Sequence, residues 1–231
     1  MPPKATPKSE ATQAHILATA LELFQAHGFE KTTMRMIAAE AGLSLGAAYY
    51  YFSTKEALVL HFYAQTGAEA RERNSEIVAA SADFQQRMQG LLLFKLEQMA
   101  PFRELATVLA RQAADWDHPL SPFSPHTKPM RDEAIGLIED VLSGSNLKVS
   151  GAVRPHLPRI LWLYQMGIIL FWVNDPSPDY RRTRTLITVS LALVQRLTRA
   201  TALPFMKGIN QSAVEIVETV MGGTGRAERE S

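Results

Sequence analysis

The chain has 231 residues, with 24 lysines and arginines against 23 aspartates and glutamates, and no cysteine. A chain of this length buries roughly 70% of its unfolded surface, so it can form one compact unit or a small domain joined to a larger one. The absence of cysteine excludes a disulfide framework and a thiolate metal site. The polar start MPPKATPKSEAT has no apolar run and is not a signal peptide, so we expect a cytoplasmic protein.

Residues 1–11 are rich in proline, lysine, threonine and serine, which predicts a disordered tail. From Thr12 to His27 apolar residues recur at helical spacing, Gly28 provides a C-terminal stop, and Phe29 can pack back on Phe24. We interpret this first helix as a scaffold for the stretch that follows it.

The stretch that follows, TTMRMIAAEAGLSLGAAYYYFSTK, has the pattern of two short helices across a tight turn. Thr33 can cap a first helix that ends at about Ala41, and Gly42 can adopt the left-handed conformation that ends it. Ser44 can cap a second helix that runs to about Tyr51. A turn this short forces the two helices to cross steeply, so the pattern predicts a helix-turn-helix unit.

The second helix of this unit has a surface suited to DNA. Small residues at Gly46, Ala47 and Ala48 let its N-terminus approach a surface closely, and the three tyrosines after them offer hydroxyl groups to phosphates or rings to base edges. The predicted DNA-binding residues are Thr32, Thr33, Arg35, Ser44, Leu45, Gly46, Ala47, Tyr49, Tyr50, Tyr51 and Lys55.

Lys55 lies in the first turn of the next helix, which we expect to start with a capping box of Ser53 and Glu56. The helix dipole disfavours a cation there, so an external phosphate explains this lysine better than fold stability does; a solvated lysine is the alternative. Residues 1–56 contain five lysines and arginines against five aspartates and glutamates, which is not the strongly basic surface of many DNA-binding proteins. Backbone N–H groups and tyrosine hydroxyls also bind phosphates, so we keep the DNA-binding prediction and expect a weak salt dependence.

The residues from about Thr12 to Leu60 resemble the TetR family of bacterial transcriptional regulators. The match rests on Ile16-Leu17, Ala20-Leu21, Phe24, Gly28-Phe29, Thr32-Thr33, Ile37-Ala38, Ala41-Gly42-Leu43-Ser44, Gly46, Tyr49, Tyr51-Phe52 and Lys55-Glu56-Ala57-Leu58. The resemblance implies a dimeric, mostly helical repressor whose third helix lies in the major groove.

The same resemblance implies phosphate contacts from the positions Thr33, Tyr49, Tyr51 and Lys55. In two places the sequence departs from the family pattern. Leu45 stands where lysine is frequent, and Ala47 where threonine is frequent, and both changes remove polar contacts. We therefore expect the operator sequence, or the strength of binding, to differ from the usual behaviour of the family.

The rest of the chain has the periodicity of further helices. They are predicted over residues 53–75, 84–100, 102–116, 130–142, 153–174, 179–203 and 210–221, with a second disordered tail at 223–231. The predicted fold is all-α. An N-terminal three-helix DNA-binding domain with the helix-turn-helix occupies 12–56, and a larger helical ligand-binding and dimerisation domain occupies 57–222.

Methionines and aromatic residues on these helices could line a cavity for an apolar ligand, although ordinary core packing is the alternative for each of them. The ligand-binding residues predicted on this basis are Phe62, Met99, Phe102, Trp116 and Tyr164. The proline-rich segment 117–129 has the composition of a loop that can cover an opening. The acidic and histidine side chains near it match no known ligand spacing, so we predict no metal site and no cofactor; they are Asp115, Asp117, His118 and His126.

The sequence ILWLYQMGIILFWV is apolar on nearly every side of its helix, yet shorter than the roughly 20 residues that cross a bilayer. We therefore expect no membrane insertion, and a helix covered by its own core on one side and by a partner subunit on the other. The predicted residues of this four-helix homodimer interface are Trp162, Tyr164, Gln165, Ile168, Ile169, Trp172, Ile187, Leu191, Val194 and Gln195. The alternative is that all of them belong to the core of the monomer.

The predicted function is a ligand-responsive repressor that binds a palindromic double-stranded DNA operator as a homodimer and is released by a small apolar molecule. A helical enzyme is one alternative, but the sequence lacks a nucleophile motif, metal-spaced histidines, phosphate-binding glycines and paired carboxylates. A helical adaptor that binds only protein is the other alternative, and binding to duplex DNA distinguishes it from a regulator.

Overall fold

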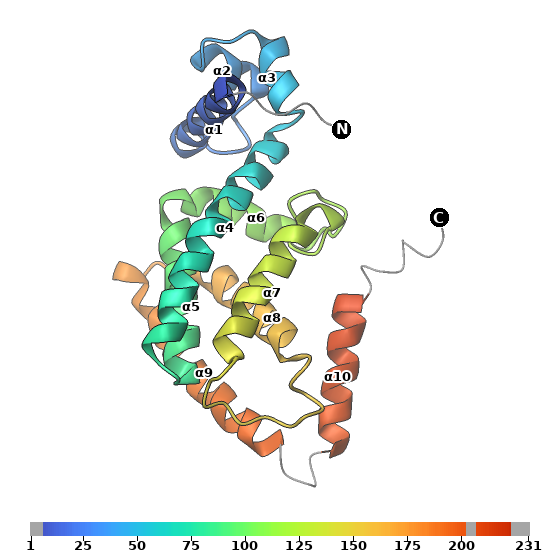
Figure 1. Cartoon of the computed structure of the whole chain (residues 1–231). Helices are drawn as coiled ribbons and strands as arrows, with labels where there is room; N and C mark the ends of the chain where they lie inside the picture. Colours follow the sequence, from blue (N-terminus) through green and yellow to red (C-terminus); the bar gives the residue numbers. More distant parts are fainter. Residues whose placement is uncertain (1–6, 202–206, 223–231) are drawn as a thin grey trace.

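The computed structural model describes residues 7–201 and 207–222, and within these ranges it contains helices and no strand (Figure 1). The α-helices are α1 (Pro7–His27), α2 (Met34–Glu40), α3 (Leu45–Tyr51), α4 (Lys55–Ala80), α5 (Phe84–Met99), α6 (Arg103–Gln112), α7 (Lys128–Leu142), α8 (Leu157–Trp172), α9 (Arg181–Thr201) and α10 (Lys207–Gly222). Short 3-10 turns lie at Ala100–Phe102, Pro125–Thr127 and Pro178–Tyr180. The predicted all-α fold is confirmed.

Helices α1, α2 and α3 form an N-terminal unit around one hydrophobic cluster, which we call the N-terminal core. Its buried members include Ile16, Phe24, Ile37, Ala48 and Phe52. The ring of Phe24 packs on that of Phe29, with centroids 5.1 Å apart, as the sequence predicts. The three helices thus hold one another in a fixed arrangement.

Helix α1 begins at Pro7, so the prediction of a disordered tail is wrong for residues 7–11. Glu10 lies in the first turn of the helix, where the helix dipole favours a negative charge. The remaining predicted tails, at residues 1–6 and 223–231, lie outside the described residues.

Helix α4 joins the N-terminal unit to the rest of the chain (Figure 1). Its Leu58 and Val59 are buried in the N-terminal core, whereas its Ala70 is buried in the core of the larger domain. Leu105 of α6 and Leu120 also enter the N-terminal core. Packing of the N-terminal unit therefore extends beyond residue 56, where the sequence places a domain boundary, and α4 is in contact with both cores.

Helices α5, α7, α8 and α9 build the C-terminal core, in which Phe84, Met88, Ile138 and Trp172 are fully buried. Helix α8 contacts α5, α6, α7, α9 and α10, which explains why it is apolar on nearly every side. Among the described residues, no helix is both long enough and apolar enough to span a membrane.

The predicted dimer interface is wrong for most of its residues, because the chain covers them itself. The buried ones are Trp162, Gln165, Ile168, Trp172, Ile187 and Leu191, and Tyr164, Ile169, Val194 and Gln195 are half-buried. The alternative, that they belong to the monomer core, is correct for the buried six. Periodicity cannot tell which sides of a uniformly apolar helix meet its own chain and which meet a partner.

The turn between α8 and α9 is held by the buried carboxylate of Asp175. Its two oxygens accept hydrogen bonds from the backbone N–H and hydroxyl of Ser177, at 3.0 and 2.7 Å, and from those of Thr183, at 2.9 and 2.6 Å. Burial opposes ionisation of this group, but the four hydrogen bonds outweigh burial and hold the pKa of Asp175 well below its usual range. The ionised carboxylate therefore fixes the start of α9.

Replacing Asp175 by asparagine is expected to lower the free energy of unfolding at neutral pH, because an amide cannot accept all four hydrogen bonds. A carboxylate whose pKa is lowered by folding contributes stability above its unfolded pKa of about 4, and this contribution is lost as the pH falls from there toward the folded pKa. The difference between the two proteins in urea unfolding should therefore shrink at about pH 3. Asp179→Asn, in the same turn but exposed, is the control, and a difference independent of pH would contradict this account.

Candidate nucleic-acid interface and ligand cavity

The turn between α2 and α3 has the geometry that the sequence predicts. Thr33 caps α2 by accepting a hydrogen bond from the N–H of Met36 at 3.3 Å, and Ser44 caps α3 by accepting one from Ala47 at 3.2 Å. Gly42 has a φ of 66°, in the left-handed region that favours glycine. These local signals fix the angle at which α3 leaves the turn.

Helix α3 has one face held inside the N-terminal core and one face exposed to solvent. Ala48 is fully buried, and Phe52, just after the helix, is 4% exposed. By contrast, the side chains of Tyr49 and Tyr50 are 47% and 79% exposed. Tyr51 is half-buried and meets Tyr50 edge to face, with ring centroids 5.2 Å apart. The helix thus presents tyrosine rings at the molecular surface, where a DNA groove could receive them.

Some of the residues predicted to bind DNA have side chains that are not exposed to solvent. Thr32 is only 1% exposed, and its hydroxyl donates to the carbonyls of Gly28, at 2.8 Å, and Leu23, at 3.2 Å. The prediction for Thr32 is therefore wrong, because its side chain closes the loop between α1 and α2. Leu45 is half-buried against the N-terminal core. Exposed positions among the predicted residues are Thr33, Arg35, Ser44, Gly46, Tyr49 and Tyr50.

The ammonium group of Lys55 has partners within the fold. This contradicts the expectation that an external phosphate explains the position of this lysine better than fold stability does. Its ammonium group donates to the carbonyl of Phe29 at 2.9 Å and lies 4.2 Å from the centroid of the Phe29 ring. The predicted capping box is also wrong, since Thr54 caps α4 by accepting from Ala57 at 3.1 Å. Lys55 thus fastens the loop between α1 and α2 to the start of α4.

Replacing Lys55 by alanine is expected to lower the free energy of unfolding by about 1–3 kcal/mol, through loss of a charged hydrogen bond and a cation–π contact. Urea unfolding of the variant and of Lys31→Ala, an exposed lysine of the same loop, measures the effect. Unchanged stability together with weaker DNA binding would contradict this role and restore Lys55 to the phosphate contacts.

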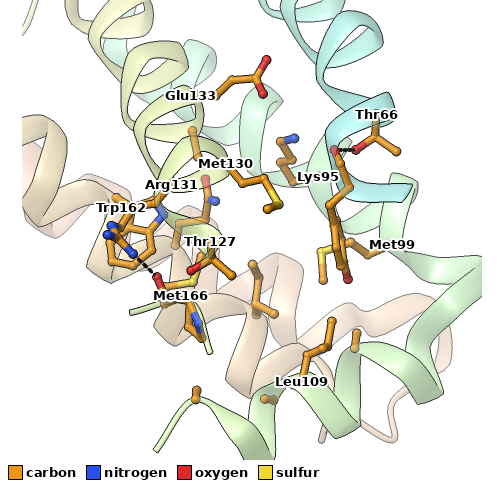
Figure 2. A pocket seen from close by; sticks show the side chains of 18 of the residues that line it. Thr66, Lys95, Met99, Leu109, Thr127, Met130, Arg131, Glu133, Trp162 and Met166 are labelled. Carbon is orange, nitrogen blue, oxygen red and sulfur yellow. Dashed lines mark hydrogen bonds between the residues drawn. The ribbon is translucent and has the colours of Figure 1, made fainter. Parts of the chain in front are cut away.

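A cavity of about 380 Å³ lies between α4, α5, α6, α7 and α8 (Figure 2). Its walls are mainly apolar and include Met99, Leu109, Met130, Trp162 and Met166. This volume lies in the range of roughly 300–1,000 Å³ that small-molecule sites have. The segment 117–129, predicted to cover an opening, supplies Leu120, Pro122 and Phe123 to the wall.

Of the predicted ligand-binding residues, Met99 alone lines this cavity. Phe62 and Phe102 instead pack on each other, with centroids 4.8 Å apart, beside the N-terminal core. Trp116 stacks on Phe123 and is 45% exposed. The hydroxyl of Tyr164 is hydrogen-bonded to that of Ser190 at 2.6 Å, between α8 and α9. Those four predictions are wrong, because aromatic content identifies packing partners as readily as ligand contacts.

Small residues create the cavity, and this is the signal that an emphasis on aromatic residues misses. Ala106, Ala110 and Ala113 follow one another at helical spacing from α6, and Gly67 and Ala70 lie opposite on α4. The polar and apolar faces of α6 are strongly separated. Alanines on its apolar face leave a volume empty that leucines at the same positions would fill. Trp162, Gln165 and Ile169, predicted for the dimer interface, line the same space.

The cavity touches both cores. Leu60, Tyr63 and Leu109 in its wall pack against the N-terminal core, and Leu137 and Trp162 belong to the C-terminal core. Burial raises the pKa of the Tyr63 hydroxyl above its ordinary value. A molecule in the cavity would therefore contact the helix that carries the N-terminal unit.

Hydrogen bonds hold the segment between α6 and α7. Thr127 donates to the carbonyl of Ser121 at 2.7 Å, and Arg131 donates to that of Pro122 at 2.7 Å. The ring nitrogen Nδ1 of His118 accepts from the N–H of Leu120 at 3.2 Å. Within the described residues, no group of three or more acidic, histidine or cysteine side chains is placed to hold a metal ion.

Two family models match the chain. The model described as "Bacterial regulatory proteins, tetR family" matches residues 16–62, and that described as "Tetracyclin repressor-like, C-terminal domain" matches residues 87–214. The two uncharacterized HTH-type transcriptional regulators YfiR and YerO of Bacillus subtilis (strain 168) are similar in sequence. YfiR is 32% identical over 111 residues, covering 48% of this chain and 52% of YfiR, and YerO is 49% identical over 45 residues, covering 20% of this chain and 16% of YerO. The chain thus matches about half the length of the first relative and less of the second.

Solved structures share the fold. The TetR family transcriptional repressor FadR of Thermus thermophilus, in complex with lauroyl-CoA, has a TM-score of 0.60 at 22% identity and covers 78% of this chain and 92% of its own. The SmeT–triclosan complex has a TM-score of 0.56 at 20% identity and covers 79% and 91%. SmeT is the repressor of the Stenotrophomonas maltophilia multidrug efflux pump SmeDEF. At these identities the likeness shows a common fold.

Proposed function

This chain belongs to the TetR family of bacterial transcription regulators, and we propose that it is a repressor that binds a palindromic operator as a homodimer and is released by a small apolar molecule. The observation that carries the DNA-binding part is the exposed tyrosine face of α3, with Tyr49 and Tyr50 outside and Ala48 inside. A regulator of this kind acts on the chromosome, so we infer that the protein works in the bacterial cytoplasm. The family is one of DNA-binding regulators, which disfavours the enzyme and the protein-binding adaptor.

Recognition requires two copies of α3 at a defined spacing. In a two-fold dimer the helices would enter successive major grooves about 34 Å apart, the length of one helical turn of DNA. Tyr49 and Tyr50 would contact base edges or phosphates, and the exposed Thr33 and Arg35 would lie along the DNA backbone. The rings would fix the position of α3 in the groove.

The dimer surface proposed here differs from the one predicted from the sequence. Val189, Leu193 and Leu197 repeat every four residues along α9 and are 64%, 55% and 56% exposed. These side chains form one apolar stripe that the described part of the chain leaves uncovered. A two-fold axis would pair this stripe with its copy and remove both from water.

A ligand in the cavity would act on DNA binding through α4. Leu60, Tyr63 and Gly67 of α4 line the cavity, and Leu58 and Val59 of the same helix are packed in the N-terminal core. A ligand that binds better when α4 is tilted favours that state, in which the two α3 helices no longer match the groove spacing. The small molecules in two structural neighbours, lauroyl-CoA and triclosan, support a small-molecule effector.

Selection of bound fragments from a randomised duplex library tests this function. The full chain is expected to enrich an inverted repeat whose half-sites are one helical turn apart. Enrichment of a single half-site would contradict the dimeric operator, and no enrichment at all would contradict the DNA-binding role.

A further inference from the structure

A lysine lies in the otherwise apolar wall of the cavity. Lys95 of α5 is half-buried, and Figure 2 shows it extending toward the side where Thr66 of α4 and Glu133 of α7 lie. Its ammonium group makes one hydrogen bond, at 3.4 Å to the side-chain oxygen of Gln98, which is long for such a bond. Among the described residues it has no ion pair.

Two carboxylates whose charges act on Lys95, those of Glu133 and Glu69, each have another partner. Glu133 is paired with Arg71 of α4, and Glu69 accepts a hydrogen bond from Gln98 at 2.9 Å. Gly67 makes the first arrangement possible, since a Cβ there would lie 2.5 Å from a carboxylate oxygen of Glu133. Burial lowers the pKa of Lys95, and the charges of Glu133 and Glu69 offset only part of this effect.

The remaining cavity wall contains a second positively charged side chain, Arg131, and, within the described ranges of the chain, no carboxylate other than that of Glu133. Arg131 lines the wall, is 7% exposed and donates only to the carbonyls of Pro122 and Ser124. Beyond these groups the walls consist of aliphatic and aromatic side chains, the methionines Met99, Met130 and Met166, and a few uncharged polar residues such as Thr66 and Gln165. Thioether side chains adapt to apolar molecules of different shape. The walls therefore combine an apolar space with an ammonium group that forms no ion pair among the described residues.

We propose that the effector is an amphipathic organic anion whose carboxylate contacts Lys95 and whose apolar body fills the space among Met99, Leu109, Met130 and Met166. This inference rests on the proposed function and refines it, since the effector keeps an apolar body for that site but also carries an anionic head group. A carboxylate at Lys95 would accept charge-assisted hydrogen bonds from the ammonium group, which now donates a single long one to the side-chain oxygen of Gln98. A cationic head group would instead meet an ammonium group whose neighbouring carboxylates are already engaged.

Titration calorimetry on the full chain with three amphiphiles of equal tail length tests the proposal. The probes are decanoate, decanol and decyltrimethylammonium, each below its micelle-forming concentration. Decanoate is expected to bind about tenfold to hundredfold more tightly than decanol, and decyltrimethylammonium more weakly than either. In Lys95→Gln, the affinity for decanoate should fall to that for decanol. The affinity for decanol should be unchanged, which also shows that the variant keeps its cavity.

Lys128→Gln is the matched control, because Lys128 lies on α7 outside the cavity wall and pairs with Asp132 at 2.6 Å. Its decanoate affinity should equal that of the unaltered chain. Equal binding of the three amphiphiles, preference for the cation, or retention of the decanoate preference in Lys95→Gln would overturn the proposal, as would no binding of any amphiphile. Enrichment of an operator by the same sample then separates a failure of this inference from a failure of the proposed function.

Discussion

Replacing Tyr50 by alanine is expected to lower the affinity for the selected operator by about tenfold to hundredfold, the loss that follows from removing one well-placed contact to a base. The side chain is 79% exposed, so the free energy of unfolding should change little. Fluorescence anisotropy with a labelled operator measures the affinity, and urea unfolding measures the stability.

Trp116→Ala is the control for this substitution, because Trp116 is also an exposed aromatic residue but lies outside the helix-turn-helix unit. It should leave operator affinity unchanged. Tyr49→Phe removes only a hydroxyl group and separates a phosphate contact, which it would weaken, from a ring contact, which it would keep. Unaltered affinity in Tyr50→Ala would contradict the role of the Tyr50 ring in recognition, and unaltered affinity in Tyr49→Phe would exclude a contact from the Tyr49 hydroxyl group.

Placing glutamates at both Leu193 and Leu197 is expected to convert the proposed dimer into a monomer and to lower operator affinity by at least about a hundredfold, because a monomer contacts one half-site. The four carboxylates brought together at the two-fold axis would repel one another and lose hydration. Sedimentation velocity gives the oligomeric state, and anisotropy gives the affinity.

Thr188→Glu provides the comparison, since Thr188 is exposed on α9 but lies on a different side of the helix from the apolar stripe. It should remain dimeric. A double variant that stays dimeric would show that the exposed stripe of Val189, Leu193 and Leu197 is not the interface.

The parts of the fold that depend on local chemistry follow from the sequence. Thr33, Gly42 and Ser44 act within a few residues of themselves, so their capping and turn roles are predictable and confirmed. The role of Lys55 could not be predicted in this way, because its hydrogen-bond acceptor, the carbonyl of Phe29, is 26 positions away in the chain. The burial of Thr32 likewise depends on how the loop after α1 closes.

The larger domain shows where periodicity fails. The sequence of α8 is apolar on nearly all sides, and only the arrangement of α6, α7 and α9 decides which side chains meet the core. On α9 the inward Ile187 and Leu191 and the outward Val189 and Leu193 are chemically alike, so sequence could not separate core from surface. The cavity depends on small side chains of α4 and α6 that face each other across the fold, a property of tertiary packing.

Methylation interference on the selected operator tests the central claim most directly. Dimethyl sulfate modifies guanine at N7 in the major groove and adenine at N3 in the minor groove, so it reports which groove the protein occupies. If α3 inserts its tyrosine face as proposed, guanine methylation should block binding in two half-sites one helical turn apart. Interference confined to adenines, or found in a single half-site, would contradict it.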